Sequence, residues 1–177
     1  MIPPYEGLRE LQFWSFQSIN VHVISAWIFW NSATLDSITL GPRLSRLAGG
    51  LDRRPGDFSW LRLDLQHCIR LRTVTTYLPQ LGLATGPPAD RPAVQYLKAL
   101  VHQLPPSVTA IYIRLTVAKE NDRIFVINTV DWQTVFSTIF RRNINMRVVI
   151  LFRQGRHGWD AALLAAMQTH LAGTPRK

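Results

Sequence analysis

The chain has 177 residues, of which 47% are hydrophobic, and its 20 lysines and arginines outnumber 11 acidic residues to give a formal net charge of +9. This length and composition predict one folded domain with a continuous core and exclude a largely disordered chain. The longest apolar run, residues 21–30, falls short of the roughly 20 residues that cross a bilayer, and this excludes a membrane span there.

The compartment is predicted from two further features. The beginning of the sequence has neither the basic residues nor the apolar segment of a secretory signal. The single cysteine, Cys68, can form neither an internal disulfide nor a metal cage. We therefore expect an intracellular protein, in the cytoplasm or the nucleus, with no membrane association.

The positive charge can attract nucleic acid, an anionic membrane surface or an acidic protein. The cations are dispersed in short clusters, such as Arg53–Arg54 and Arg141–Arg142, and they form no polybasic tail. This pattern favours a solvated basic surface, and nucleic-acid binding is the weaker interpretation.

The first half of the chain twice shows an L-x-x-L-x-L pattern, which is typical of leucine-rich-repeat strands. It begins at Leu8, before a helix predicted over 21–30 with Val23, Ile24, Trp27 and Ile28 on one face. The pattern returns at 35–40, where Gly41 and Pro42 follow and stop the strand. A loop is predicted near 41–57.

The segment WLRLDLQHCIRLRTVTTY, residues 60–77, carries the pattern most clearly. Leu63, Leu65 and Cys68 fit a repeat strand and the turn that leaves it, and Leu71 begins the pattern again. A loop near 79–91 contains Asp90, a candidate N-cap for a helix that has Pro92 in its first turn and ends at Pro105–Pro106.

The second half of the chain continues the alternation of strand and helix. The pattern recurs at Val108 and at Met146, with a helix capped by Asp131 between them. A loop is predicted near 118–123, a short extra strand at 124–127 and a final helix at 159–171.

The pattern therefore starts at residues 8, 35, 71, 108 and 146, and successive starts are 27, 36, 37 and 38 residues apart. Each unit has an apolar strand face and an apolar helix stripe that only a neighbouring unit can bury. The spacing predicts an α/β fold in which residues 1–177 form a single repeat domain. This domain is a leucine-rich-repeat-like curved solenoid, with a parallel β-sheet backed by helices. The alternative is a compact doubly wound α/β domain, which has helices on both faces of its sheet.

Three segments carry a family resemblance: LRLDLQHCIRLRTV at 61–74, LPPSVTAIYIRL at 104–115 and VDWQTVFSTIFRRNINMRVVILF at 130–152. Together they resemble the leucine-rich-repeat-like region of F-box proteins from mushroom-forming fungi. The resemblance implies a substrate-recognition solenoid, which in some members is fused to an F-box that docks on the Skp adaptor of a cullin ubiquitin ligase.

This sequence departs from the family because it enters a repeat strand at Leu8 and contains no F-box. The chain is expected to be either a fragment of a longer solenoid protein or a version without the ligase connection. A Skp-type adaptor is a partner only if an F-box lies outside this chain.

The residues between the leucines are expected on the concave face of the sheet, because side chains alternate along a strand. The candidate interaction residues on this face are Glu10, Gln12, Thr39, Asp64, Thr75, Tyr112 and Arg114. Tyr112 beside Arg114 resembles an interface hot spot, where aromatic and arginine side chains are enriched. On the last strand the same alternation points Val148, Ile150 and Phe152 outward, as an apolar patch that a helix or a partner must cover.

No arrangement of residues predicts catalysis. Cys68 fits a buried repeat position, and His67 would point the opposite way along a strand. The five histidines lack metal-ligand spacing, and GLATGPP lacks the lysine and helix of a phosphate-binding loop. We expect no catalytic, metal-binding or cofactor-binding residues and no cofactor. The sequence predicts a non-catalytic protein–protein interaction scaffold, with a basic nucleic-acid-binding domain as the alternative.

Overall fold

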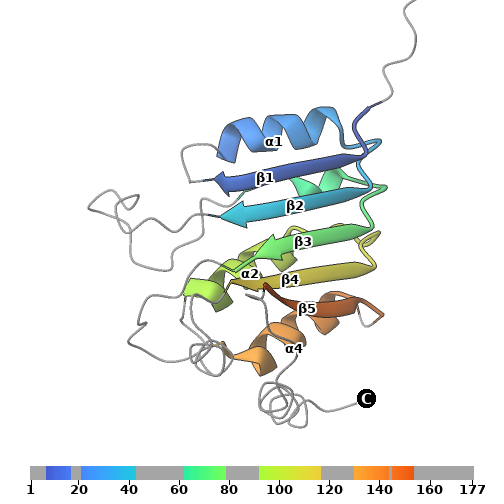
Figure 1. The fold of residues 1–177 in the computed structure, drawn as a ribbon. Helices are drawn as coiled ribbons and strands as arrows, with labels where there is room; N and C mark the ends of the chain where they lie inside the picture. The colour runs from blue at the N-terminus through green and yellow to red at the C-terminus, as the bar shows by residue number, and fades with distance from the viewer. Residues whose placement is uncertain are drawn as a thin grey trace, which may run out of the picture.

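The structure, a computed structural model, describes residues 7–16, 21–42, 62–78, 92–116, 130–143 and 145–153. These residues form an α/β fold around a five-stranded parallel sheet (Figure 1). The strands lie in the sheet in the order of the sequence, β1-β2-β3-β4-β5. Each of the first four strands is therefore connected by a crossover to the strand at the next position in the sheet.

The bounds of the elements follow the alternation that the sequence predicted. The strands are β1 (Glu10–Phe16), β2 (Ser37–Pro42), β3 (Thr73–Tyr77), β4 (Ala110–Thr116) and β5 (Arg147–Arg153). The helices are α1 (Val21–Trp30), the short 3-10 helix η2 (Leu65–His67), α2 (Pro92–His102) and α4 (Trp132–Arg142).

Neighbouring strands are related by a nearly constant shift in sequence. Glu10 pairs with Ser37, Ser37 with Thr73, Thr73 with Ala110, and Ala110 with Arg147. The shifts are therefore 27, 36, 37 and 37 residues. The first crossover is the short one, and the following three have almost equal length.

A repeated set of backbone hydrogen bonds extends the sheet ahead of the strands. The carbonyl oxygens of Arg9, Asp36 and Arg72 each accept two N–H groups from the next unit, at 2.8 to 3.2 Å. Thr109 continues the series, since its carbonyl oxygen accepts the N–H of Arg147 at 2.8 Å. Equivalent residues in successive units thus make equivalent bonds.

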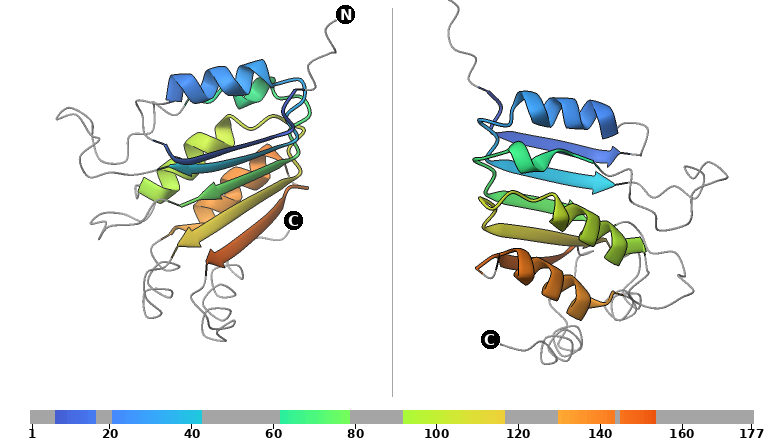
Figure 2. Two further views of the ribbon diagram at one scale, coloured as in Figure 1. Left: turned by 45° about the horizontal axis from the view of Figure 1, so that its top comes forward. Right: turned by 180° about the vertical axis from the view of Figure 1, so that it is seen from behind.

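The helices α1, η2, α2 and α4 lie on one face of the sheet, as the two views in Figure 2 show. Leu11, Ile38, Val74 and Ile111 of the first four strands are buried at this face. The helices contribute Ile24, Ile28, Val94, Leu97, Leu100, Val135 and Ile139 to the same core. In the described residues, the two-sided helix arrangement of a doubly wound domain is not present.

The starts of the two longest helices follow from their sequences. Asp131 caps α4 as predicted, since its Oδ1 accepts the backbone N–H of Thr134 at 3.0 Å. Helix α2 begins at Pro92. The N–H of the first helical residue has no acceptor within the helix, so proline, which lacks this N–H, costs no hydrogen bond at this position. One buried polar contact joins this helix to β3: the hydroxyls of Thr76 and Tyr96 are 2.7 Å apart.

The predicted register of the last strand was wrong by one residue, and its side chains therefore lie on the opposite faces from those predicted. Val148 pairs with Ile111 and Ile150 with Ile113, and both pack against the helix-side core instead of pointing outward. The side chain of Phe152 lies outside the described part of the chain. Because residues 148–152 are all apolar, the sequence alone does not reveal which of two registers the strand adopts.

Three smaller expectations also needed correction. Residues 65–67 form the helix η2 instead of a repeat strand. Strand β2 includes Gly41 and Pro42, which were expected to follow it. On α1, Ile24 and Ile28 are buried as predicted, but Val23 and Trp27 are 49% and 44% exposed. The predicted loops at 43–57, 79–91 and 118–123, the strand at 124–127 and the helix at 159–171 lie outside the described residues.

Candidate functional site

The sheet face opposite the helices, called the open face below, is formed by alternate residues of all five strands. The strand register arranges these residues in rows that cross the sheet. The first row is Glu10, Ser37, Thr73, Ala110 and Arg147, and the second is Gln12, Thr39, Thr75, Tyr112 and Val149. The third row consists of Trp14 paired with Gly41, and of Tyr77 paired with Arg114 and Leu151.

Most of the residues proposed from the sequence lie on this face. The structure places Glu10, Gln12, Thr39, Thr75, Tyr112 and Arg114 there. They occupy the alternate positions between the buried residues of their strands. The sequence therefore located the face, although it gave no reason to prefer one row over another.

Asp64 is the exception, and its predicted position was wrong. It precedes η2 in the left-handed region, with φ 52°, and belongs to no strand. Its carboxylate accepts a hydrogen bond from the Ser25 hydroxyl of α1 at 2.7 Å. Asp64 therefore lies on the helix side, where it joins two neighbouring units.

The third row contains an aromatic contact that crosses a strand. Trp14 on β1 and Tyr77 on β3 have ring centroids 4.9 Å apart, with the rings tilted by 60°. The residue between them on β2 is Gly41, which pairs with Trp14. A glycine leaves no side chain between the two rings, so they meet above the backbone of β2. Trp14 remains 54% exposed, which is a large apolar surface for one side chain.

Arg114 on β4 completes this group. Its Nη1 donates a hydrogen bond to the Tyr77 hydroxyl at 2.6 Å, and its guanidinium carbon lies 5.4 Å from the centre of the Tyr77 ring. Both contacts fix the plane of the guanidinium over the sheet. Its Nε is buried and has no hydrogen-bond partner among the described residues. Arg114 therefore holds a buried donor that the described part of the chain leaves unsatisfied.

The charge of Arg114 is also uncompensated within the described part of the open face. The acidic side chain among the three rows is Glu10, whose Oε1 accepts a bond from Gln12 at 2.8 Å. Glu10 lies on β1, three strands from β4, which corresponds to about 14 Å at the usual strand spacing. We call Trp14, Tyr77 and Arg114 the aromatic–arginine cluster.

Sequence reasoning missed two members of the cluster. Trp14 and Tyr77 continue the outward alternation beyond Gln12 and Thr75, which was the available signal. The contact between them depends on Gly41, and this requires the pairing of β1 with β2. The spacing of residues along the sequence does not reveal which residues of β1 and β2 pair.

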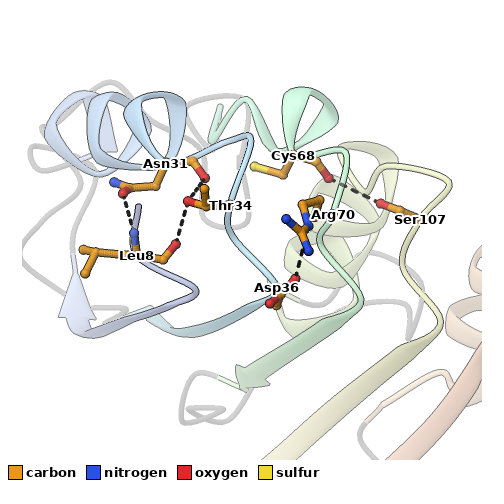
Figure 3. Close-up of polar contacts among 7 residues, drawn as sticks. All are labelled: Leu8, Asn31, Thr34, Asp36, Cys68, Arg70 and Ser107. Atoms are coloured by element: carbon orange, nitrogen blue, oxygen red, sulfur yellow. Dashed lines mark hydrogen bonds and ion pairs between the residues drawn. The ribbon is translucent and has the colours of Figure 1, made fainter. Parts of the chain in front are cut away.

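A second feature is a shallow depression of about 410 Å³ at the edge where the strands begin, lined by Ile69, Arg70, Arg72, Pro106, Ser107 and Thr109. Its polar groups join adjacent turns (Figure 3). Arg70 forms an ion pair with Asp36 at 3.9 Å, and the Ser107 hydroxyl donates to the carbonyl of Cys68 at 3.3 Å. These contacts give the depression a structural role in linking successive units.

The remaining chemical groups include one buried thiol. Burial raises the pKa of the Cys68 thiol to about 11, so this sulfur is protonated near neutral pH. Across the described ranges, no three or more histidine, cysteine or acidic side chains are grouped so that they could hold a metal ion. No helix in that part of the chain has the length and apolar content of a membrane span.

A further exposed surface lies on α1. Trp30 is 74% exposed and Phe29 59%, and Trp27 contacts Trp30 with ring centroids 6.2 Å apart. These side chains point away from the core that Ile24 and Ile28 enter.

Comparisons of the chain with protein-family models, with curated proteins and with solved structures found no match.

Proposed function

We propose that the chain is a non-catalytic protein–protein interaction scaffold and that its partner binds the open face of the sheet. The observation that carries the proposal is the aromatic–arginine cluster, in which Trp14 is exposed and Arg114 has a donor without a partner. Tryptophan, tyrosine and arginine are the residues most enriched in interface hot spots. The helices leave this face uncovered in the described part of the chain.

We further propose that the units stack as a leucine-rich-repeat-like solenoid. Three observations support this: strands in sequence order, helices on one side, and shifts of 36, 37 and 37 residues after the first crossover. In such stacks each unit contacts its neighbours, and the concave sheet face is a common binding surface. The proposed location is inside the cell, which is supported by the single cysteine.

The more specific proposal is that the chain is the substrate-recognition part of an F-box-type ubiquitin ligase adaptor. Its support is the sequence resemblance of residues 60–171 to the leucine-rich-repeat-like region of such proteins. Contact with a Skp-type adaptor requires an F-box outside this sequence. Recovery of Skp or cullin subunits with the full-length protein supports the ligase proposal, and their absence from a capture that recovers other partners contradicts it.

The second candidate is a nucleic-acid-binding domain, which the open face also favours in one respect. Trp14, Tyr77 and Tyr112 lie on a sheet face next to an arginine, and exposed aromatic rings can stack against bases. However, the cations among the described side chains of this face are Arg114 and Arg147 alone. A backbone of regularly spaced phosphates needs a longer series of cations, so this candidate ranks second.

Paired variants of one substitution test the proposed surface. Thr75→Glu places a long charged side chain at the centre of the open face, and Gln133→Glu places the same side chain on the exposed surface of α4. The wild type and both variants are used to capture partners from cells by proximity labelling. We expect Thr75→Glu to lose partners that Gln133→Glu retains. Equal recovery by both variants contradicts the open face as the binding surface.

Salt dependence separates the two candidate functions. If the partner is a nucleic acid, affinity falls steeply as salt is raised, with one counterion released for about every phosphate contact. A protein partner held by one arginine and an aromatic contact shows a shallow dependence. Binding of a single-stranded oligonucleotide is measured over a range of salt concentrations, and a steep slope favours the second candidate.

A further inference from the structure

We propose that the open face selects an extended acidic peptide, with a carboxylate of the peptide on Arg114 and a nearby apolar side chain on Trp14 and Tyr77. This inference rests on the proposed function and specifies the chemistry of the partner. The aromatic–arginine cluster supplies both halves of the recognition.

The charged half is the guanidinium of Arg114. Tyr77 occupies Nη1 and the ring lies beneath the cation, so the guanidinium is held in place before a ligand arrives. Its charge faces no carboxylate nearby among the described side chains of the open face, where Glu10 is engaged with Gln12 three strands away. A carboxylate is a planar acceptor that suits a guanidinium. Binding a peptide carboxylate there neutralises the charge.

The apolar half is the surface formed by Trp14 and Tyr77. Their contact across Gly41 spans β1 to β3, next to the strand that carries Arg114. Rings held in this way lose little conformational freedom on binding, so burial of an apolar side chain against them is favourable. Trp14 has more than half of its surface available for such a contact.

The positions of the two halves set the spacing within the peptide. The ring centroids of Trp14 and Tyr77 are 4.9 Å apart, and the guanidinium carbon of Arg114 lies 5.4 Å from the centre of the Tyr77 ring, so the two halves lie within about 10 Å of each other. An extended chain covers about 3.4 Å per residue, so this distance corresponds to about three residues. The preferred peptide therefore has an apolar or aromatic residue within about three positions of an aspartate or glutamate.

The polar surroundings favour a peptide over a phosphate chain. The second row supplies Thr39, Thr75 and Tyr112, whose hydroxyls can donate to or accept from peptide groups. One unpaired arginine beside an aromatic pair fits a single acidic side chain. A nucleic acid would place several phosphates over a face whose other described cation, Arg147, lies in a different row.

The test uses a phage-displayed library of random linear peptides, selected on the whole chain. We expect enrichment of aspartate or glutamate with an apolar residue within about three positions. The affinities of the selected peptides are measured by fluorescence polarisation. Arg114→Gln should weaken them about tenfold or more, because it removes one partner of a desolvated charge pair. Arg114→Lys keeps the charge but loses the planar edge, and an intermediate loss is expected.

Matched controls remove the same groups elsewhere. Arg141→Gln removes a positive charge from α4 on the helix side, and Trp30→Ala removes an exposed tryptophan from α1. Both should leave the affinity within about twofold of the wild type, whereas Trp14→Ala should weaken it about threefold or more. Circular dichroism of each variant verifies the fold.

The outcomes separate this inference from the proposed function. If Thr75→Glu blocks the selected peptides but they show no acidic preference, or Arg114→Gln binds like the wild type, the acidic-peptide inference fails and the open face stands. If Thr75→Glu binds the peptides unchanged, the proposed surface itself fails. Failure to select any peptide, or an oligonucleotide that binds more tightly than the peptides with a steep salt slope, overturns the inference.

Discussion

The two faces of the sheet are made by the same strands, yet their side chains have opposite roles. On the helix side, residues such as Ile111 and Val74 are fully buried, and the contacts between units are apolar. On the open face, their neighbours Tyr112 and Thr75 are partly exposed and polar. One side holds the units together and the other is available for binding. Substitutions on adjacent residues of one strand can test this division.

The largest expected difference is between Ile111 and Tyr112 on β4. Ile111→Ala leaves a cavity in the core and should lower the free energy of unfolding by about 2–5 kcal/mol. Tyr112→Ala removes a partly exposed ring and should cost about 1 kcal/mol or less. Urea unfolding followed by circular dichroism measures both values. Equal losses would show that the two faces are not distinct in burial.

The next pair lies on β3. Thr76→Val removes a buried hydrogen bond between the hydroxyls of Thr76 and Tyr96, and we expect a loss of about 1–3 kcal/mol. Thr75→Val, on the open face, should change the free energy of unfolding by no more than about 0.5 kcal/mol. The same unfolding experiment applies. A Thr76→Val variant as stable as the wild type would contradict the polar link between β3 and α2.

A smaller effect is expected at the start of α4. Asp131→Ala removes the side chain that caps the N–H of Thr134, and the expected loss is about 1 kcal/mol. Asp131→Asn retains an acceptor and should lose less. Gln133→Ala, on the exposed side of the same helix, serves as the control, and a cost equal to that of Asp131→Ala would argue against capping.

The buried thiol of Cys68 gives a prediction that depends on pH. Its pKa is raised by burial from 9.0 to about 11, so the unfolded chain ionises before the folded one. Below pH 9 the thiol is neutral in both states and stability is unaffected. As pH rises from 9 to about 11, the free energy of unfolding should fall. The Cys68→Ala variant should show a smaller fall over this range. An equal fall in both proteins would contradict the assignment.

The sequence predicted the alternation of strands and helices better than it predicted the register. The patterns at Leu8, Leu35, Leu71 and Val108 located four strands, because one polar and one apolar face make the alternation unambiguous. Strand β5 is apolar on both faces, so Met146 also fitted the first position of the pattern. Starting the pattern there assigned the side chains of β5 to the wrong faces of the sheet. With the register that the structure shows, the last shift becomes 37 and matches the one before it.

The site was predicted in part for a related reason. Alternation identifies which residues leave the core, and it placed Tyr112 and Arg114 correctly. Leu63 and Leu65 fit the same alternation, but Leu63 precedes η2 and Leu65 is its first residue. The position of Asp64 between them was therefore predicted wrongly. The contact of Trp14 with Tyr77 depends on which residue lies between them on the neighbouring strand. Such a contact joins three strands, and no local pattern encodes it.

The most direct test of the binding role of the open face is photo-crosslinking from two exposed aromatic positions. A benzophenone amino acid replaces Tyr112 on the open face in one protein and Phe140 on the outside of α4 in another. Both proteins are irradiated with a selected peptide, and the cross-linked product is measured by mass spectrometry. Our account predicts cross-links from position 112 and none above background from position 140. Cross-links from position 140 alone would contradict it.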